Sequence, residues 1–282
     1  MSAFDEHRRL LFAIAYRILG SAGDAEDAVQ ETWLKWSAAE RSDVADPKAY
    51  LARIVTNQAT DQLRTARRET YVGPWLPEPL PTSAETDPDD VSMAMLVVLE
   101  TLTPIERAVF VLREVFDFSY TEIASAVDRT EEAVRQSAHR AREHVRARRP
   151  RFSSDRRRHR DATERFLAAA TGGDINGLME LLAPDVTLWT DGGGKVRQAR
   201  RPVSGAARVA AWMAGVAKVP YEGVDPADMR AEVIELNGAP GVVFSGAGRV
   251  IATLTFDLDE QGRIREIFNV ANPDKLRAVT PS

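Results

Sequence analysis

The sequence predicts a multidomain protein in which two all-α helical domains precede an α+β domain. Apolar residues recur at helical spacing over residues 1–70 and 91–150, and a proline-rich linker, residues 71–90, separates these stretches. Over residues 160–282, short helical patterns give way to alternating apolar residues between turn signals, as in an α+β domain. A chain of 282 residues is long enough for each domain to have its own core.

The composition excludes several classes of function. Apolar residues make up 44% of the chain and there is no cysteine, so disulfides, iron–sulfur clusters and thiol catalysis are excluded. The longest strongly apolar stretch, Met93 to Leu99, is far shorter than the roughly 20 residues of a membrane-spanning helix. We therefore expect a cytoplasmic protein without membrane association, cofactor or bound metal.

Positive charge is concentrated in one short stretch. Residues 135–165 carry a net charge of +8, whereas residues 1–134 carry −11 and residues 166–282 carry −2. An acidic chain with one basic patch binds nucleic acid weakly, because nonspecific affinity grows with the number of lysines and arginines that reach phosphates. The distribution favours a protein that reaches DNA with the help of a partner.

The first 68 residues predict three helices. The first ends at Gly20, a typical C-cap, and the third begins at Asp46 and Pro47. After Asp24, the second helix has one stripe that is predicted to be buried: Ala25, Ala28, Val29, Trp33 and Trp36. The third helix combines an apolar stripe with a polar face that could meet a ligand, formed by Asn57, Asp61, Arg64 and Arg68.

The second helical domain contains the layout of a helix-turn-helix. Capping boxes at residues 103–106 and 119–122 predict helix starts, and a helix from Tyr120 to Val127 is followed by a turn at residues 128–130. The next helix has an apolar stripe, with a polar and basic face opposite. The stripe consists of Val134, Ala138, Ala141 and Val145, and the opposite face of Arg135, Gln136, His139, Arg140 and Arg142.

The last domain predicts helices followed by a meander of strands. Asn237 and Gly238 lie between alternating apolar runs, which is a strong signal of a β-hairpin. The expected helices are Ala162–Thr171, Ile175–Ala183 and Gly205–Ala217, and the expected strands are Val186–Thr190, Arg230–Leu236, Gly241–Ser245, Arg249–Leu258 and Arg263–Asn269.

Several segments resemble a known family. The segments "AEDAVQETWLKW", "PKAYLARIVTNQATDQLRTARR" and "LTPIERAVFVLREVFDFSYTEIASAVDRTEEAVRQSAHRAREHVR" resemble regions two and four of the extracytoplasmic-function sigma factors of bacterial RNA polymerase. "WLPEP", "DGGGK" and "NPDKL" resemble motifs of the subgroup with a fused SnoaL-like domain. The resemblance implies sigma region 2, the region 4 helix-turn-helix, and a cone-shaped α+β domain of the SnoaL and ketosteroid-isomerase type.

The resemblance implies two partners, promoter DNA and core RNA polymerase through its beta-prime clamp and beta flap. The second helix would dock on the clamp through Asp24, Glu26, Asp27, Glu31, Trp33 and Trp36. The alternative is that both tryptophans are core residues and the acids are merely solvated. The loop from Arg41 to Asp46, with Asn57, Asp61 and Arg64, would hold the unwound −10 element. An ordinary helix contact is the alternative for Asn57.

Region 4 would place its second helix in the major groove of the −35 element. Glu132, Arg135, Gln136 and His139 would reach base edges, with Arg135 on a guanine, while Arg140 and Arg142 suit phosphates. Asp128 stands where this motif commonly has glycine, but Asp tolerates the left-handed conformation. Arg129 also departs from the apolar residue common there. For the basic run 146–160, a solvated linker is favoured over a DNA-binding strap.

The last domain lacks the residues that catalysis would need. All four histidines precede residue 160, and Tyr221 is the only tyrosine after it, although Asp191 or Asp257 could act as an isolated base. We therefore expect no enzymatic activity. A pocket lined by Trp189, Trp212, Met213 and Phe256 could hold a small ligand that the sequence does not identify.

We hypothesise that the three short motifs form one regulatory contact, with residues 191–195 as a tight turn. Replacing Asp191 and Lys195 with Ala is expected to change transcription without unfolding the domain. The residues of this contact would be Trp75, Leu76, Pro77, Glu78, Pro79, Asp191, Gly192, Gly193, Gly194, Lys195, Asn272, Pro273, Asp274, Lys275 and Leu276. The tethered domain would set in cis how readily the DNA-binding domains engage polymerase.

The sequence thus predicts a sigma factor that directs promoter-specific transcription initiation. The alternatives are a SnoaL-type enzyme of small molecules and a DNA-binding repressor. The missing pocket histidine speaks against the enzyme. The acidic tryptophan-containing helix and the two linked helical domains speak against the repressor, which needs neither.

Overall fold

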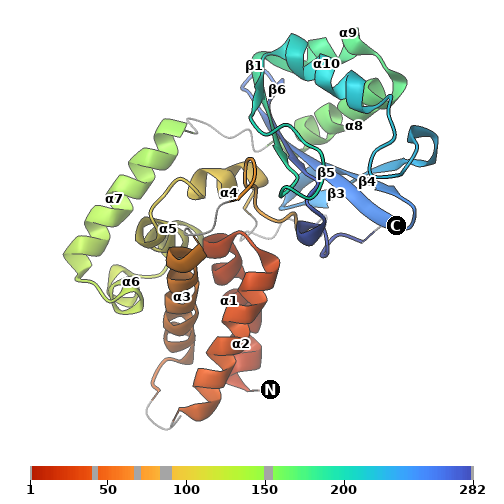
Figure 1. Cartoon of the computed structure of the whole chain (residues 1–282). Coiled ribbons are helices and arrows are strands. Elements are labelled where there is room, and N and C mark those ends of the chain that lie inside the picture. Colours follow the sequence, from red (N-terminus) through yellow and green to blue (C-terminus); the bar gives the residue numbers. More distant parts are fainter. Residues whose placement is uncertain (1, 40–43, 67–70, 83–90, 149–154, 281–282) are drawn as a thin grey trace. The chain divides into compact units, whose positions relative to one another are not determined.

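The computed structural model describes the chain except residues 1, 40–43, 67–70, 83–90, 149–154 and 281–282 (Figure 1). It divides into two compact units. The first contains Met1–Thr70 and Leu96–Pro150, and the second contains Tyr71–Met95 and Arg151–Ser282. Arg41, Arg68 and the middle of the basic run 146–160 lie outside the described residues.

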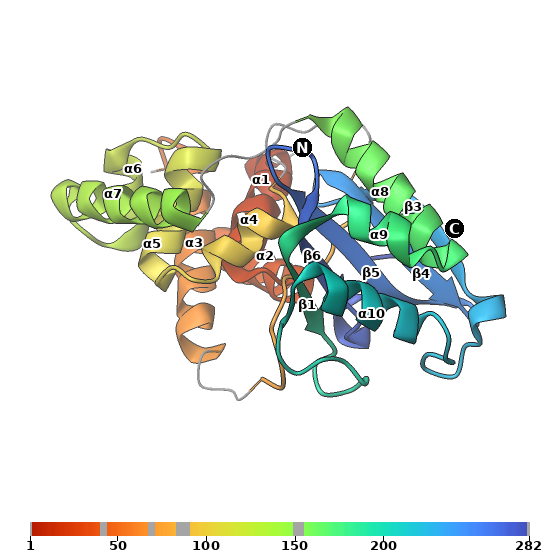
Figure 2. The same cartoon turned by 90° about the horizontal axis from the view of Figure 1, so that it is seen from above.

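The first unit begins with three helices, α1 (Ala3–Leu19), α2 (Ala22–Ala38) and α3 (Pro47–Ala66), which lie side by side (Figures 1 and 2). The predicted C-cap Gly20 is confirmed, because it adopts φ +72° and its N–H donates to the carbonyl of Tyr16. Leu11, Ile14 and Ile18 of α1 are fully buried against the neighbouring helices.

The predicted buried stripe of α2 is wrong at one position. Trp33 is 48% exposed, and Thr32 takes the place in the core between Ala28 and Trp36. A polar residue is tolerated there because its hydroxyl donates to the carbonyl of Ala28, within the helix itself. Trp36 is only 5% exposed, and its ring centroid lies 5.8 Å from that of Tyr50 on α3.

The region 4 helices follow the predicted layout. They are α4 (Met93–Leu99), α5 (Pro104–Phe110) with a π-helical turn over Val111–Val115, α6 (Tyr120–Val127) and α7 (Glu131–Arg148). Both predicted capping boxes are present, at Thr103 with Glu106 and at Ser119 with Glu122. Asp128 ends α6 at φ 52° and ψ 56°, so the turn does form with Asp in the left-handed conformation.

One buried arginine joins the two helical segments of the first unit, and sequence analysis did not detect it. The Nε of Arg107, on α5, donates to the carbonyl of Arg17 on α1 at 2.9 Å, and its Nη1 pairs with Glu100. Arg107 is 1% exposed, so this cation is held entirely inside the unit. The two helical segments therefore share one core.

The second unit is a six-stranded sheet with helices on one face (Figure 2). Strand order is β2-β1-β6-β5-β4-β3, with β1 parallel to β6 and all other neighbours antiparallel. Phe166, Val209, Leu254 and Ile267 are part of the core between helices and sheet. The elements are α8 (Arg156–Gly172), α9 (Ile175–Leu181), β1 (Leu182–Asp191), β2 (Val203–Ser204), α10 (Ala206–Val216), β3 (Arg230–Leu236), β4 (Ala239–Gly246), β5 (Arg249–Leu258) and β6 (Ile264–Val270), with 3-10 turns at Pro226–Asp228 and Pro273–Lys275.

The favoured interpretation of residues 146–160 as a solvated linker is wrong at the end that enters the sheet domain, whereas residues 146–148 are exposed. α7 continues to Arg148, and α8 begins at Arg156 because Asp155 caps its first turn. Arg156 and Arg160 both pair with Glu235 on β3, whose side chain is 5% exposed. Here the basic run supplies partners for a buried carboxylate.

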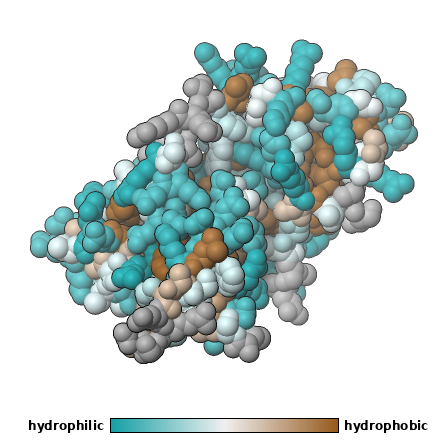
Figure 3. Space-filling model, turned by 60° about the horizontal axis from the view of Figure 1, so that its bottom comes forward, coloured by the Kyte–Doolittle hydropathy of each residue, from teal (hydrophilic) through white to brown (hydrophobic). Residues whose placement is uncertain are grey.

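The predicted hairpin is confirmed. Asn237 and Gly238 connect β3 to β4 with φ of +52° and +71°, the positive values that a type I′ turn requires. On the face drawn in Figure 3, hydrophilic residues predominate and hydrophobic ones form separate patches. No helix among the described residues is long and apolar enough to cross a membrane.

Candidate DNA-reading face and linker-docking site

The α7 helix presents the predicted polar face to solvent. Val134, Ala138, Ala141 and Val145 are buried, and this stripe fixes the rotation of the helix. On the other side Glu132, Arg135, Gln136, His139 and Arg140 are exposed, while Arg142 is half-buried. We call the five exposed residues the α7 face.

Arg135 is held in place from two sides. Its Nη2 lies 3.0 Å from Glu131 Oε2, and its guanidinium lies 4.4 Å from the ring centroid of Tyr120. Hydrogen bonds from Thr121 and then from Arg135 lower the pKa of Glu131, so this carboxylate stays charged near neutral pH. A guanidinium group carries five N–H donors, so Arg135 can pair with Glu131 and still have donors available for the edge of a base.

The two arginines expected to bind phosphates both have carboxylate partners on preceding elements. Arg140 Nε donates to Glu106 at 2.9 Å, and Arg142 Nη1 lies 3.6 Å from Glu114. Arg140 remains 58% exposed, whereas Arg142 is 35% exposed. Of the two, Arg140 has the more accessible guanidinium group.

In region 2, the structure separates the two tryptophans. Asp24, Glu26, Asp27, Glu31 and Trp33 are exposed on α2, and Glu26 pairs with Arg8 at 2.6 Å. Trp36 is buried in the helical core, so the expectation that it contributes to a polymerase-binding surface is corrected. On α3, Asn57, Asp61 and Arg64 are exposed, with 2.7 Å between Arg64 Nη1 and Asp61 Oδ1.

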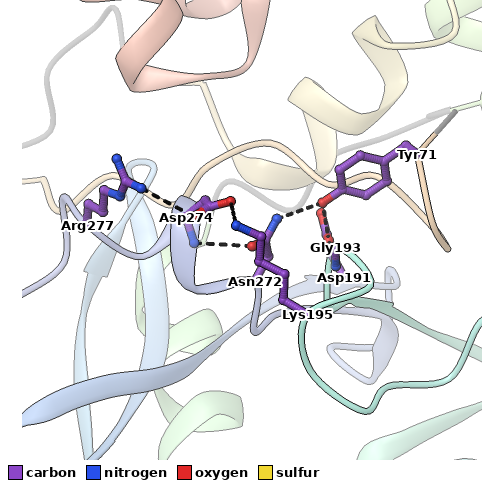
Figure 4. A network of polar contacts seen from close by, with 7 residues as sticks. All are labelled: Tyr71, Asp191, Gly193, Lys195, Asn272, Asp274 and Arg277. Atoms are coloured by element: carbon purple, nitrogen blue, oxygen red, sulfur yellow. Dashed lines mark hydrogen bonds and ion pairs between the residues drawn. The ribbon is translucent and has the colours of Figure 1, made fainter. Parts of the chain in front are cut away.

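In the second unit, the three short motifs meet around one buried carboxylate, and Figure 4 shows the residues of DGGGK and NPDKL that surround it together with Tyr71. Asp191, at the end of β1, has a fully buried side chain. Its Oδ2 accepts from the backbone N–H of Leu76 and from Lys275 Nζ, both at 2.8 Å. Its Oδ1 accepts from the Tyr71 hydroxyl at 2.6 Å and from the backbone of Gly193 at 3.0 Å. Four donors compensate the buried charge.

The ammonium group of Lys275 makes several contacts with the proline-rich segment. Nζ donates to the carbonyl of Leu76 at 2.5 Å and to Asp191, and it lies 3.9 Å from the Trp75 ring centroid and 4.8 Å from that of Tyr71. Its side chain is 7% exposed. Asp191 and Lys275 thus bind residues 71–76 by charge, hydrogen bonding and aromatic contact together.

The glycine turn permits this close approach. Gly193 has φ +58°, and a side chain on it would overlap the amide of Asn272, which in turn donates to the Tyr71 hydroxyl at 2.9 Å. Lys195 lies apart from Asp191 and pairs instead with Asp274, which also pairs with Arg277 (Figure 4). Within NPDKL, Asn272 and Leu276 are buried and Pro273 is exposed.

A second attachment lies farther along the segment. The Leu80 carbonyl accepts from the Asn237 backbone at 2.8 Å, and the Thr82 N–H donates to the carbonyl of Glu235 at 3.0 Å. Between the two attachments Pro77 and Pro79 are buried and Glu78 is half-buried. Residues 71–82, here called the docked segment, are therefore held to the sheet domain at both ends.

Two residues of this site were missed by sequence analysis. Tyr71 precedes the WLPEP motif, and the only signal was an aromatic residue in an otherwise proline-rich stretch. Burial, followed by the hydrogen bond to Asp191, raises the pKa of Tyr71. Asn237 was interpreted only as a turn residue, although its side-chain oxygen also accepts from the Leu80 N–H.

The second unit also contains a cavity of about 300 Å³ between α8, α10 and the sheet. Trp212 and Met213 line it as predicted, but Trp189 and Phe256 do not. The Trp189 indole donates to Glu266, and Phe256 is core, with its ring 4.9 Å from Phe166. Neither Asp191 nor Asp257 lines the cavity, and no metal-binding cluster occurs among the described residues.

A helix-turn-helix with an exposed basic face places the chain among DNA-binding transcription proteins. The models of Sigma-70 region 2 and Sigma-70, region 4 match residues 3–69 and 92–145. The ECF RNA polymerase sigma factor SigJ of Mycobacterium tuberculosis is 38% identical over 98% of this chain and 93% of its own. The probable ECF sigma factor SigI of that organism is 34% identical over 66% of this chain and 67% of its own.

Solved structures agree with these matches. The crystal structure of Mycobacterium tuberculosis SigJ has a TM-score of 0.76 at 32% identity, covering 98% of this chain and 97% of that one. A putative ketosteroid isomerase from Kribbella flavida covers 41% of this chain and 78% of its own, at 14% identity and a TM-score of 0.30. The chain belongs to the extracytoplasmic-function sigma factors, and its function is promoter-specific transcription initiation.

Proposed function

We propose that α7 reads the −35 element, that the exposed face of α3 holds the −10 element, and that the C-terminal domain regulates initiation in cis. The acidic residues of α2 together with Trp33 would dock on the polymerase clamp, and region 4 would dock on the flap. One observation carries the regulatory part. The buried Asp191–Lys275 pair is built around backbone and aromatic groups of the docked segment, which connects the two sigma regions.

The docked segment matters because it is most of the connection between region 2 and region 4. An extended residue spans at most about 3.3–3.6 Å, so docking immobilises 12 residues, 71–82, that could span up to roughly 40 Å between the two regions when free. The proposal is that binding to polymerase and to both promoter elements uses that freedom. A domain that holds the segment therefore restrains the sigma regions, and one that releases it frees them.

The restraint does not need strong binding. The segment and its docking site belong to one chain, so their effective concentration is on the order of millimolar and a weak contact suffices. The buried Arg107 supports a closed form as well, because its hydrogen bond to Arg17 joins the region 4 sequence to the region 2 sequence. Both contacts would have to open when the sigma regions spread on polymerase.

Run-off transcription with purified bacterial core polymerase tests the regulatory proposal on the promoter upstream of the protein's own operon. Trp75→Ala removes the ring beside Lys275 and leaves the Asp191–Lys275 pair intact, so initiation should rise several-fold over the unmodified chain. Lys218→Ala, an exposed substitution in the same unit, is the control. Equal initiation by Trp75→Ala and Lys218→Ala would contradict regulation by docking, whereas initiation by neither would contradict the sigma function itself.

The −35 proposal is tested by a matched pair of arginines on α7. Arg135→Ala should lower initiation and promoter binding by about 5- to 150-fold, because a bidentate contact to guanine discriminates by about 1–3 kcal/mol, and it should relax specificity at one base pair. Arg140→Ala, 58% exposed on the same helix and expected to bind a phosphate, should weaken binding to all sequences alike. If the two variants behaved identically, Arg135 would be a phosphate contact only.

A further inference from the structure

The cavity of the second unit has polar groups in its wall that form no hydrogen bond with any residue that the structure describes. Its walls are mostly apolar and include Trp212, Met213, Phe244 and Leu254. Its volume of about 300 Å³ is at the lower end of the range for small-molecule pockets. Leu254 and Asn269 are paired across β5 and β6, which places the amide of Asn269 beside apolar neighbours on the cavity wall.

Two amide oxygens at this cavity lack a hydrogen-bond partner among the described residues. They are Asn269 Oδ1 and Gln198 Oε1, and both atoms are shielded from bulk solvent. Asn269 is only 6% exposed. A buried acceptor without a donor is unfavourable, so both positions favour an occupant that brings O–H or N–H groups.

Tyr221 adds a donor to the same site. Its hydroxyl oxygen accepts from Gln198 Nε2 at 2.6 Å, which leaves its own hydrogen available to the cavity. Burial is the main cause that raises the pKa of Tyr221 to about 12, so the group remains a neutral donor at physiological pH. None of the residues that line the cavity is a Lys, Arg, His, Asp or Glu.

We propose that this cavity binds an uncharged small molecule with an apolar body and at least one hydroxyl or N–H group. The apolar walls take the body, the two amide oxygens accept from its donor groups, and Tyr221 donates to an acceptor on it. An ionised ligand is disfavoured because no lining residue of opposite charge would compensate its desolvation. The proposal does not depend on how the domain regulates transcription.

The test uses three naphthalenes with the full chain: 2-naphthol, 2-methoxynaphthalene, which lacks the donor, and the anion naphthalene-2-sulfonate. Calorimetric titration should show saturable binding of 2-naphthol, with 2-methoxynaphthalene and the sulfonate about tenfold weaker or worse. In nuclear magnetic resonance spectra, the indole N–H of Trp212 should shift on titration and that of Trp189 should not.

Substitutions distinguish a preference for ligands that donate a hydrogen bond from nonspecific hydrophobic binding. Gln198→Leu and Asn269→Leu should each reduce the preference for 2-naphthol over 2-methoxynaphthalene, and Gln261→Leu, at an exposed turn, should leave it unchanged. No saturable binding of 2-naphthol would mean that the cavity holds water only. Equal affinities for 2-naphthol and 2-methoxynaphthalene, or a shift of Trp189 in place of Trp212, would also overturn the proposal.

Discussion

Tyr71 shows how a single hydroxyl connects two motifs. It donates to Asp191 and accepts from Asn272, and the hydrogen bond to Asp191 requires the neutral, protonated form of Tyr71 (Figure 4). Burial and the neighbouring carboxylate raise its pKa above the ordinary value of 10.0. A raised pKa means that the stabilisation is fully present below pH 10 and is lost only as the pH rises through the folded-state pKa.

Tyr71→Phe should therefore remove one tyrosinate titration step that lies above pH 10. Ultraviolet absorbance during alkaline titration of the wild-type chain and the variant gives the difference curve, and circular dichroism shows whether each chain is still folded. A difference curve centred at or below pH 10 would mean that Tyr71 is solvated and that the contact with Asp191 does not form in solution.

At this scale, sequence reasoning succeeded where the physical cause is local. The capping boxes at Thr103 and Ser119 need residues only three positions apart, and both were predicted. The choice between Trp33 and Trp36 was decided by α1 and α3, which lie elsewhere in the sequence, and by a threonine hydroxyl bonded within its own helix. The buried Arg107 gave no signal, because its acceptor is a backbone carbonyl 90 residues away.

Among the elements, the turn of the helix-turn-helix carries measurable strain. Asp128 has φ 52°, where a side chain costs about 1–2 kcal/mol relative to glycine and Asp pays less than most residues. The turn still has the geometry that positions α7, so aspartate in place of glycine at residue 128 leaves the fold intact. It does lower the stability of the fold.

Asp128→Gly should raise the free energy of unfolding of the first unit by about 0.5–1 kcal/mol, because glycine adopts the left-handed conformation without strain. Asp128→Ala, which keeps Cβ and removes the carboxylate that helps Asp to tolerate the left-handed conformation, should lower it. Urea denaturation followed by helical circular dichroism compares the variants. A stabilising effect of Asp128→Ala would show that the strain does not arise from the left-handed backbone.

The ends of helices and strands were predicted best where a residue with a strong conformational preference, such as Asn or Gly in a turn, stands at the end. Asn237 and Gly238 fixed the β3–β4 turn, and β3 and β5 have the predicted ends. β1 begins at Leu182, earlier than expected, because Leu182 pairs with Ile264 of β6 and this partner is remote in sequence. α8 begins within the basic run, because Asp155 caps it and Glu235 attracts its arginines.

At the scale of the whole molecule, more than half of the predicted linker is a segment bound to the sheet domain. The resemblance to known motifs indicated that WLPEP, DGGGK and NPDKL could meet, and the structure brings Leu76, Asp191 and Lys275 into contact. No sequence motif predicted the second attachment, at Asn237. Such contacts depend on backbone groups, which every residue carries, and so the sequence pattern could not single them out.

Lys275→Met should release residues 71–76 while leaving the helical unit folded. Removing one partner of a buried ion pair leaves an uncompensated charge and costs about 3–5 kcal/mol, so the Leu76 amide should lose protection against hydrogen exchange. By the same reasoning, Asp191→Ala is expected to destabilise the second unit, whereas the sequence alone led us to expect a domain that stays folded. Hydrogen exchange read by mass spectrometry measures the protection.

The matched control for that experiment is Lys195→Met. Lys195 and Asp274 are about half exposed, so their pair is worth about 1 kcal/mol at most. This substitution should leave the exchange of residues 71–76 unchanged. Equal loss of protection in Lys195→Met and Lys275→Met would mean that the docked segment is held by the motif loops as a whole and not by the buried pair.

The position of Lys275 in the sequence has a consequence for the order of events on the ribosome. The Leu76 carbonyl and the Lys275 ammonium that binds it are separated by 199 residues. At about 5–20 residues per second, translation takes roughly 10–40 s to cover that distance. During this interval the synthesis of region 4 is completed, while the docked segment still lacks its contact with Lys275. Each new molecule therefore passes through a short period in which the proposed restraint by its own last domain is not yet complete.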